Sequence, residues 1–147
     1  MEYNGGLDKY GLKAINSPGL GEKLGELLGL SGAVIIPANT ATVRISGTTG
    51  LTEDMQLPAS ATEQIMLAFQ NVEDTLVAAG VQDGWRAVYD LTTYHTGSLD
   101  DPEVGSALEA AFEKYLHGNK PTWAAIGVAN LYQGARIEIR VTAALKA

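Results

Sequence analysis

Two stretches near the end of the chain decide the fold prediction: Pro121-Thr-Trp-Ala-Ala-Ile-Gly-Val-Ala129 and Gly134-Ala-Arg-Ile-Glu-Ile-Arg-Val141. Both have the composition of β-strands, and in the second, apolar residues alternate with polar ones. Successive side chains of a strand point to opposite faces, so Arg136, Glu138 and Arg140 project to one side. We expect the chain to end in a strand pair, one strand of which carries three charges on a single face.

Two further strands are predicted upstream. Ala33–Pro37 and Ala41–Ser46 are rich in β-forming residues, and they flank Ala38–Thr40, which indicates a hairpin turn. Gly47 breaks the second strand directly after Ser46. Backbone N–H groups freed at such a bend can bind an oxyanion or a carboxylate, whereas the alternative is a plain turn that ends the strand.

Two amphipathic helices are predicted around another strand at Trp85–Tyr94. The first begins at the capping box Ser60–Glu63 and ends at Gly80, and the second begins at Asp101–Pro102 and ends at Gly118. The order β-β-α-β-α-β-β predicts an α+β fold with a mixed sheet and both helices on one face. The other face must be solvated or covered by a partner.

The composition restricts the class of protein. A chain of 147 residues that is 46% hydrophobic fits one compact domain. The net charge of −7 disfavours nucleic-acid binding. The chain has no cysteine, and no apolar run is long enough to span a bilayer. The segment Met1–Gly6 does not have the pattern of a signal peptide, so we expect a cytoplasmic protein that does not bind membranes. Residues 1–28 are glycine-rich and predict an extension with a short helical turn, followed by the main domain at 29–147.

Several candidate site residues have two interpretations. Glu138 between two arginines could be a carboxylate held ionised for acid–base chemistry, or part of a charge ladder on a half-exposed sheet. Trp123 could stack a planar ligand or pack in the core. His95 and His117 fit structural or surface roles better than catalysis, and two isolated histidines predict no metal site.

The residues from about Gly29 onward resemble the Rid superfamily of enamine and imine deaminases. The resemblance covers roughly 115 residues, so it implies an N-terminal extension at 1–28 and a family domain at 29–147. It rests on the order and spacing of several segments. They are Gly29–Val34, Val43–Gly47, Ala68–Val72, Ala78–Gly80, Pro121–Ala129 and Ile137–Ile139.

This resemblance implies a chorismate-mutase-like fold, assembled as a homotrimer with small-molecule pockets at the subunit interfaces. It also implies hydrolysis of an imine or enamine to a carbonyl compound and ammonia, with no cofactor. The family's water-binding glutamate falls on Glu138, and its Ser-Gly at the pocket edge falls on Ser46 and Gly47.

The chain departs from the family pattern at other pocket positions. The arginine that grips the substrate carboxylate in the family is replaced by Trp123, which has one N–H donor and cannot form a bidentate pair. The next two positions are Ala124 and Ala125, and the pocket tyrosine falls on Leu30. We therefore expect a wider, more apolar pocket, with Arg140 as a possible replacement cation alongside Arg44.

Two hypotheses follow from the sequence. The first is a Rid-like trimer that hydrolyses or cyclises an imine-type or bulky apolar intermediate, with Glu138 as the acid–base group. The second is a small-molecule-binding homologue that has lost deaminase activity. RNA cleavage is disfavoured by the net charge. The sequence does not identify the substrate.

Overall fold

The computed structural model describes residues 2–3 and 6–146. Met1, Asn4 and Gly5, which belong to the segment considered for a signal peptide, and Ala147 lie outside the described residues. Within the described part, no helix is long and apolar enough to cross a membrane.

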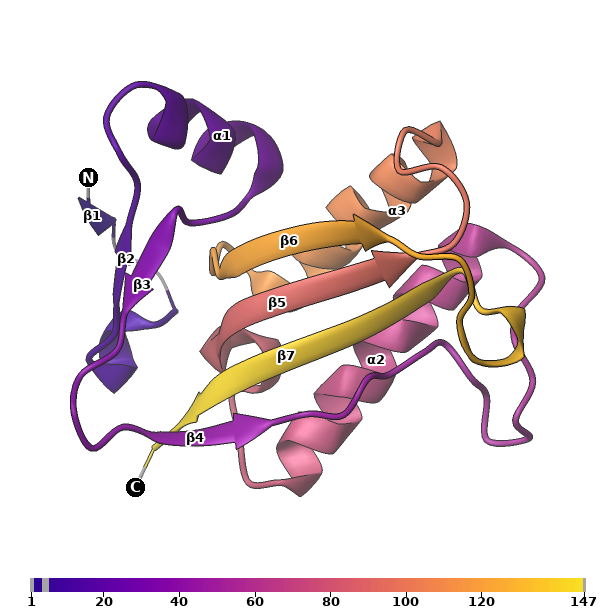
Figure 1. Ribbon diagram of the computed structural model, residues 1–147. Helices are drawn as coiled ribbons and strands as arrows, with labels where there is room; N and C mark the ends of the chain where they lie inside the picture. The colour runs from indigo at the N-terminus through magenta and orange to yellow at the C-terminus, as the bar shows by residue number, and fades with distance from the viewer. Residues whose placement is uncertain (1, 4–5, 147) are drawn as a thin grey trace.

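The centre of the molecule is a four-stranded sheet in the order β4-β7-β5-β6 (Figure 1). Its strands are β4 (Ala41–Arg44), β5 (Val88–His95), β6 (Thr122–Gly127) and β7 (Ile137–Leu145). β5 is parallel to β6, whereas β7 is antiparallel to both β4 and β5. The sheet is therefore mixed, as predicted.

The predicted terminal strand pair is wrong, because β5 lies between β6 and β7. A helix connects β5 to β6, and such a crossover returns the chain parallel to the strand it left. β6 thereby takes the edge of the sheet, and β7 inserts on the other side of β5. The register places Trp123 beside Leu91 and Glu138 beside Tyr94.

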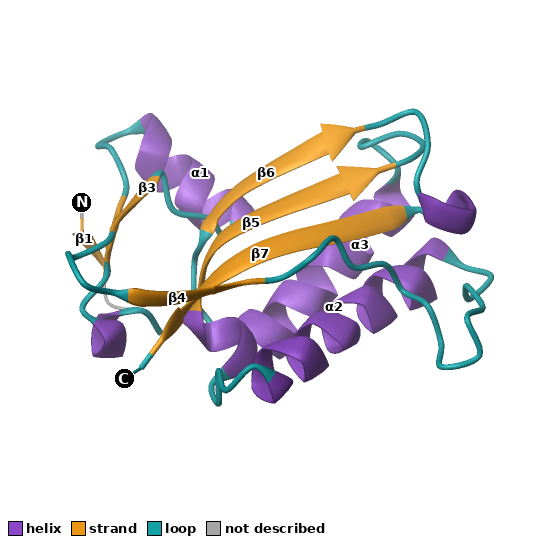
Figure 2. Cartoon of the chain, turned by 60° about the horizontal axis from the view of Figure 1, so that its bottom comes forward, coloured by secondary structure: helices purple, strands orange, loops and turns teal. Residues whose placement is uncertain are grey.

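The two predicted helices cover one face of this sheet (Figure 2). They are α2 (Ala61–Ala78) and α3 (Pro102–Ala111), which continues into the π-helical turn η3 (Phe112–Leu116). Ser60 Oγ accepts a hydrogen bond from Glu63 N at 3.1 Å, and Asp101 Oδ1 accepts one from Glu103 N at 3.0 Å. Both predicted N-caps are thus confirmed.

The core lies between the helices and the sheet. The rings of Phe69 on α2 and Trp85 stack with centroids 4.5 Å apart, and Trp85 Nε1 donates to Phe69 O at 2.8 Å. Trp85 was predicted to begin a strand, but it lies in the 3-10 helix η2 (Gly84–Ala87). Glu73 Oε1 accepts a hydrogen bond from Trp85 N at 3.1 Å, which fixes this turn, so β5 begins only at Val88.

A second, smaller sheet is formed by β1 (Glu2–Tyr3), β2 (Lys13–Ile15) and β3 (Ala33–Ile35). The predicted hairpin between Ala33–Pro37 and Ala41–Ser46 is therefore wrong, because β3 pairs with β2 and β4 pairs with β7. The turn itself exists, with Asn39 at φ 65°. The turn connects the two sheets, because β3 pairs with β2 and not with β4. The pairing of β2 with β3 joins distant segments, so a local sequence pattern does not reveal it.

The N-terminal segment also contains η1 (Asp8–Tyr10) and α1 (Leu20–Leu28), and η4 (Tyr132–Gly134) precedes β7. The segment is anchored to the turn after α2 by Asp83. Lys9 Nζ lies 2.6 Å from Asp83 Oδ2, and the Tyr10 hydroxyl donates to the same carboxylate. These two hydrogen bonds lower the pKa of Asp83, and burial, together with the Asp83 carboxylate, raises the pKa of Tyr10.

Candidate functional site

Glu138 lies on the uncovered face of the sheet. On β7 the apolar residues Ile137, Ile139 and Val141 are buried against the helices, so Glu138 and Arg140 between them point to the opposite side. Glu138 is half-buried and Arg140 is exposed. β7, which carries the candidate carboxylate, is paired with a strand on each side. Two ladders of hydrogen bonds therefore fix its backbone position.

Gly47 forms one wall of the space around the Glu138 carboxylate. A methyl group placed on Gly47 would lie 2.6 Å from Glu138 Oε2 and 2.7 Å from its Cδ. Thr48 N donates to Ile139 O at 2.9 Å, and Ile139 N donates to Thr48 O at 2.8 Å, which ties the bend to β7. The structure thus brings Gly47, and with it the neighbouring Ser46, to Glu138, which is far away in the sequence.

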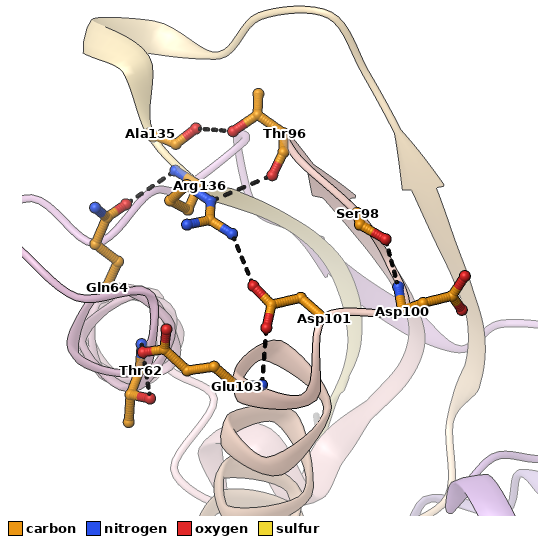
Figure 3. Close-up of polar contacts among 9 residues, drawn as sticks. All are labelled: Thr62, Gln64, Thr96, Ser98, Asp100, Asp101, Glu103, Ala135 and Arg136. Atoms are coloured by element: carbon orange, nitrogen blue, oxygen red, sulfur yellow. Dashed lines mark hydrogen bonds and ion pairs between the residues drawn. The ribbon is translucent and has the colours of Figure 1, made fainter.

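Arg136 pairs with Asp101 and not with Glu138, contrary to the interpretation of a carboxylate held between two arginines; Figure 3 shows the partners of Arg136. Its Nη2 lies 3.5 Å from Asp101 Oδ2, and its Nε donates to Thr96 O at 3.3 Å. Its backbone N donates to Gln64 Oε1 at 2.9 Å. Arg136 therefore joins the ends of β5 and β7 to the start of α3, because the Asp101 cap lies within reach of its guanidinium.

Arg140 lies on the uncovered face, near Arg44 of β4. Both line a shallow pocket of about 100 Å³, together with Asp90 and Tyr94 of β5. Among the described residues, neither arginine has a carboxylate oxygen within 4.0 Å of its nitrogens. A basic group on this face can therefore meet an anionic group of a ligand or of a second chain.

Trp123 lies on the helix-covered side of β6, opposite to Glu138. Its ring packs edge-on against Phe112 with centroids 4.9 Å apart, and its Nε1 donates to Thr93 Oγ1 at 3.0 Å. Trp123 is half-buried at the margin of the core. In one chain the sheet separates Trp123 from Glu138, so the two residues do not share a pocket there.

A groove of about 740 Å³ opens between α1, α3 and the edge strand β6. Trp123 and Ala125 form its floor, as part of a largely apolar lining. Leu30 is not among the lining residues, but its neighbours Leu28 and Gly29 are. The walls include Leu27, Leu99, Val104, Leu108 and Phe112.

The sequence did not assign Glu26, Ser106 and Glu109 to the site, yet they line this groove. The helical spacing of Leu24, Leu27 and Leu28 predicted only a short helical turn, whereas the structure has the helix α1 over Leu20–Leu28, and the sequence did not indicate the surface that it faces. The apolar stripe of the second helix was visible too. Which of these surfaces meet is decided by contacts between distant segments, and no local pattern specifies them.

His95 is buried at the end of β5. Its Nε2 lies 2.7 Å from Thr93 Oγ1, and its Nδ1 is a buried atom with no hydrogen-bond partner among the described residues. Burial and the nearby charge of Arg136 lower the pKa of His95. Both effects favour the neutral imidazole, and through its contact with Thr93 Oγ1 His95 supports the residue to which Trp123 donates. Within the described residues no group of three or more His, Cys, Asp or Glu side chains could hold a metal ion.

Comparison with known proteins gives consistent results. The family model described as Endoribonuclease L-PSP matches residues 29–145. The RutC family protein YjgH of Escherichia coli strain K12 is 34% identical over 101 residues, which are 67% of this chain and 72% of that protein.

Solved structures show the same fold. A Rid-family protein of unknown function, YyfB from Yersinia pestis, superposes with a TM-score of 0.76 at 22% identity, over 91% of this chain and 98% of that one. Escherichia coli TdcF with bound serine superposes with a TM-score of 0.64 at 22% identity, over 80% of this chain and 94% of that one.

Proposed function

Because this chain belongs to the Endoribonuclease L-PSP family of Rid proteins, we propose that it acts on an imine, an enamine or another bulky apolar reactive intermediate. We propose further that it is a cytoplasmic homotrimer whose ligand pocket lies between subunits. The observation that carries the proposal is the placement of Glu138, whose carboxylate lies against Gly47 on the uncovered face of the sheet.

The proposed reaction is hydrolytic deamination with Glu138 as the acid–base group. Glu138 takes a proton from water while the water oxygen bonds to the carbon of the C=N group, and returns this proton to the nitrogen as the C=N π bond breaks. Glu138 then moves the hydroxyl proton of the carbinolamine to the amine nitrogen, so ammonia leaves as the C–N bond breaks and the carbonyl forms. A positioned carboxylate typically accelerates such proton transfers about 10²- to 10⁴-fold. Cyclisation of a bulky intermediate would use the same proton transfers.

The proposal of a pocket between subunits is supported by the separation of the two parts of the candidate site, Glu138 and Trp123. The Glu138 region and the groove at Trp123 lie on opposite sides of the sheet, so a ligand in contact with both needs a second copy of the chain. The uncovered face, which carries Arg44 and Arg140, is available for such a contact.

In this proposal the substrate is not a small amino-acid derivative. The TdcF structure contains serine, whose carboxylate requires a cationic or donor-rich site. In this chain, Trp123 stands at the position of the family arginine, and its indole N–H is already bonded to Thr93. We therefore propose a larger substrate without a carboxylate at that position.

The same replacement favours a second candidate function, a small-molecule-binding protein without deaminase activity. Trp123 could have removed the substrate anchor while leaving the apolar groove intact. The endoribonuclease name of the family is not extended to this chain, because its net charge of −7 opposes contact with phosphate backbones.

Ammonia release tests the proposal. Imines are generated in situ from amines or amino acids by an oxidase, and ammonia is measured with wild type, Glu138→Gln and the control Glu113→Gln, which changes an exposed residue of η3. We expect turnover of aromatic imines that falls at least about 100-fold in Glu138→Gln and is unchanged in the control. Unchanged turnover in Glu138→Gln would refute its role and favour the binding protein, and a monomer in sedimentation would refute the interface pocket.

A further inference from the structure

The groove between α1, α3 and β6 has charges of one sign only. Glu26 of α1 and Glu109 of α3 line it, and no lysine, arginine or histidine of the described residues does. Both carboxylates are exposed, and neither has a cationic nitrogen within 4.0 Å among those residues. Two like charges beside one apolar groove repel an anionic ligand and attract a cationic one.

The donors in the groove are few as well. Trp123 Nε1 donates to Thr93 Oγ1, so the indole offers a ligand its π-face and not its N–H. Of the lining side chains, Ser106 supplies a hydroxyl, and the others besides the two glutamates are apolar or glycine. A carboxylate ligand would therefore lose its hydration without gaining a cation or a set of donors.

The aromatic floor fits the opposite ligand chemistry. Trp123 and Phe112 meet edge to face, which leaves ring surface available for stacking or for contact with a cation. From these observations we propose that the groove binds an apolar aryl-alkyl amine or the protonated imine derived from it, with the ring over Trp123 and Phe112 and the nitrogen toward Glu26 and Glu109. This inference rests on the proposed function, whose substrate class it names.

The proposal also assigns a role to the N-terminal segment. Glu26, Leu27 and Leu28 precede residue 29, where the match to the family model begins, yet they form one wall of the groove. In this proposal α1 is a specificity-determining element that lies before the part of the chain matched by the family model. The Glu109 carboxylate comes from the opposite wall, so a ligand nitrogen is approached from two sides.

Binding can be measured independently of turnover with the full chain labelled with ¹⁵N. The protein has two tryptophans, and Trp123→Phe identifies which indole N–H signal belongs to Trp123. Three probes of similar shape are titrated at pH 7: 2-phenylethylamine, 2-phenylethanol and 3-phenylpropionate. We expect the Trp123 signal to shift with the amine at the lowest concentration, with the alcohol less tightly bound and the acid about tenfold weaker than the amine.

Two substitutions test the charges. Glu26→Gln and Glu109→Gln should each weaken binding of the amine about two- to fivefold and leave the alcohol unchanged, because exposed ion pairs contribute little individually. Glu113→Gln, which does not line the groove, should change neither.

Any of three results would overturn the inference. The acid could bind as tightly as the amine or more tightly, or the affinity for the amine could be the same in wild type and both glutamine variants. The third result is that no probe shifts the Trp123 signal, as when a second copy of the chain fills the groove. Binding of the amine is measured apart from ammonia release, so loss of the proposed reaction and loss of the proposed ligand class are separate outcomes.

Discussion

β7 and β6 flank the same strand, β5, but they are built differently. β7 pairs with neighbours on both sides, and Ile137 and Ile139 on its inner face are fully buried. β6 lies at the edge, and four of its six residues, from Ala124 to Gly127, are exposed. The candidate proton-transfer residue is thus on a strand that is held by neighbours on both sides. The residues proposed to contact the ligand are on an edge strand, where a substitution disturbs the core less, so the two proposed functions can change independently.

The largest expected effect on stability tests this difference directly. Ile139→Ala removes a fully buried side chain from β7 and leaves a cavity, so the free energy of unfolding should fall by about 2–5 kcal/mol. On β6, Trp123→Phe removes one hydrogen bond from a half-buried ring and should cost about 1 kcal/mol. Urea unfolding measures both. Equal losses would show that β6 is as much part of the core as β7, and the comparison would fail.

A pair of glycines tests the same contrast through activity. In Gly47→Ala the new methyl group would lie 2.6 Å from Glu138 Oε2. The carboxylate is the flexible end of its side chain, so it can move away with little loss of stability. A displacement of about 1 Å at a reacting group can cost about 100-fold in rate, and we expect a decrease of this size in ammonia release.

The matched control for Gly47→Ala is Gly127→Ala at the end of β6. No heavy atom lies within 4 Å of the position that its methyl group would take, and its φ is not in the left-handed region. This variant should keep full activity and stability. Wild-type turnover in Gly47→Ala, with thermal unfolding unchanged, would show that Glu138 does not need its present position.

These two strands also show what the sequence could and could not predict. The helices at Ser60 and Asp101 were predicted well, because caps and amphipathic stripes depend on residues a few positions apart. The adjacency of β6 and β7 was predicted wrongly, because strand pairing depends on a crossover helix and on β5. The grouping of Glu138 with Gly47 was implied by family resemblance, and the opposite placement of Trp123 follows only from the register with Leu91.

The pH dependence of stability tests the strand between them. Burial and the charge of Arg136 lower the pKa of His95, so below the unfolded pKa near 6.5 the unfolded chain binds a proton that the folded chain does not. The contribution of His95 to the free energy of unfolding is therefore fully present above that pH. It decreases as the pH falls toward the pKa of His95 in the folded chain. His95→Gln should remove this slope in urea unfolding between pH 8 and 5, whereas the exposed His117→Gln should retain it. A slope that persists in His95→Gln would show that the end of β5 is hydrated and not a dry support for Thr93.

The smallest expected effect concerns the N-terminal segment, which contacts both regions. Leu7 and Leu12 pack against Ala144 of β7, whereas α1 forms the wall of the groove beside β6. Asp83→Asn weakens the bonds to Lys9 and Tyr10 that anchor this segment, and should lower the free energy of unfolding by less than about 1 kcal/mol, since Lys9 is half exposed. The decrease should shrink further in high salt, because salt screens the ion pair in the wild type.

Ammonia release by Asp83→Asn should be unchanged, since Glu138 depends on β7 and Gly47. 2-Phenylethylamine should bind slightly more weakly because α1 is held less firmly. A fall in turnover as large as that of Gly47→Ala would mean that the segment positions Glu138, and that chemistry and ligand contact are not carried by separate strands.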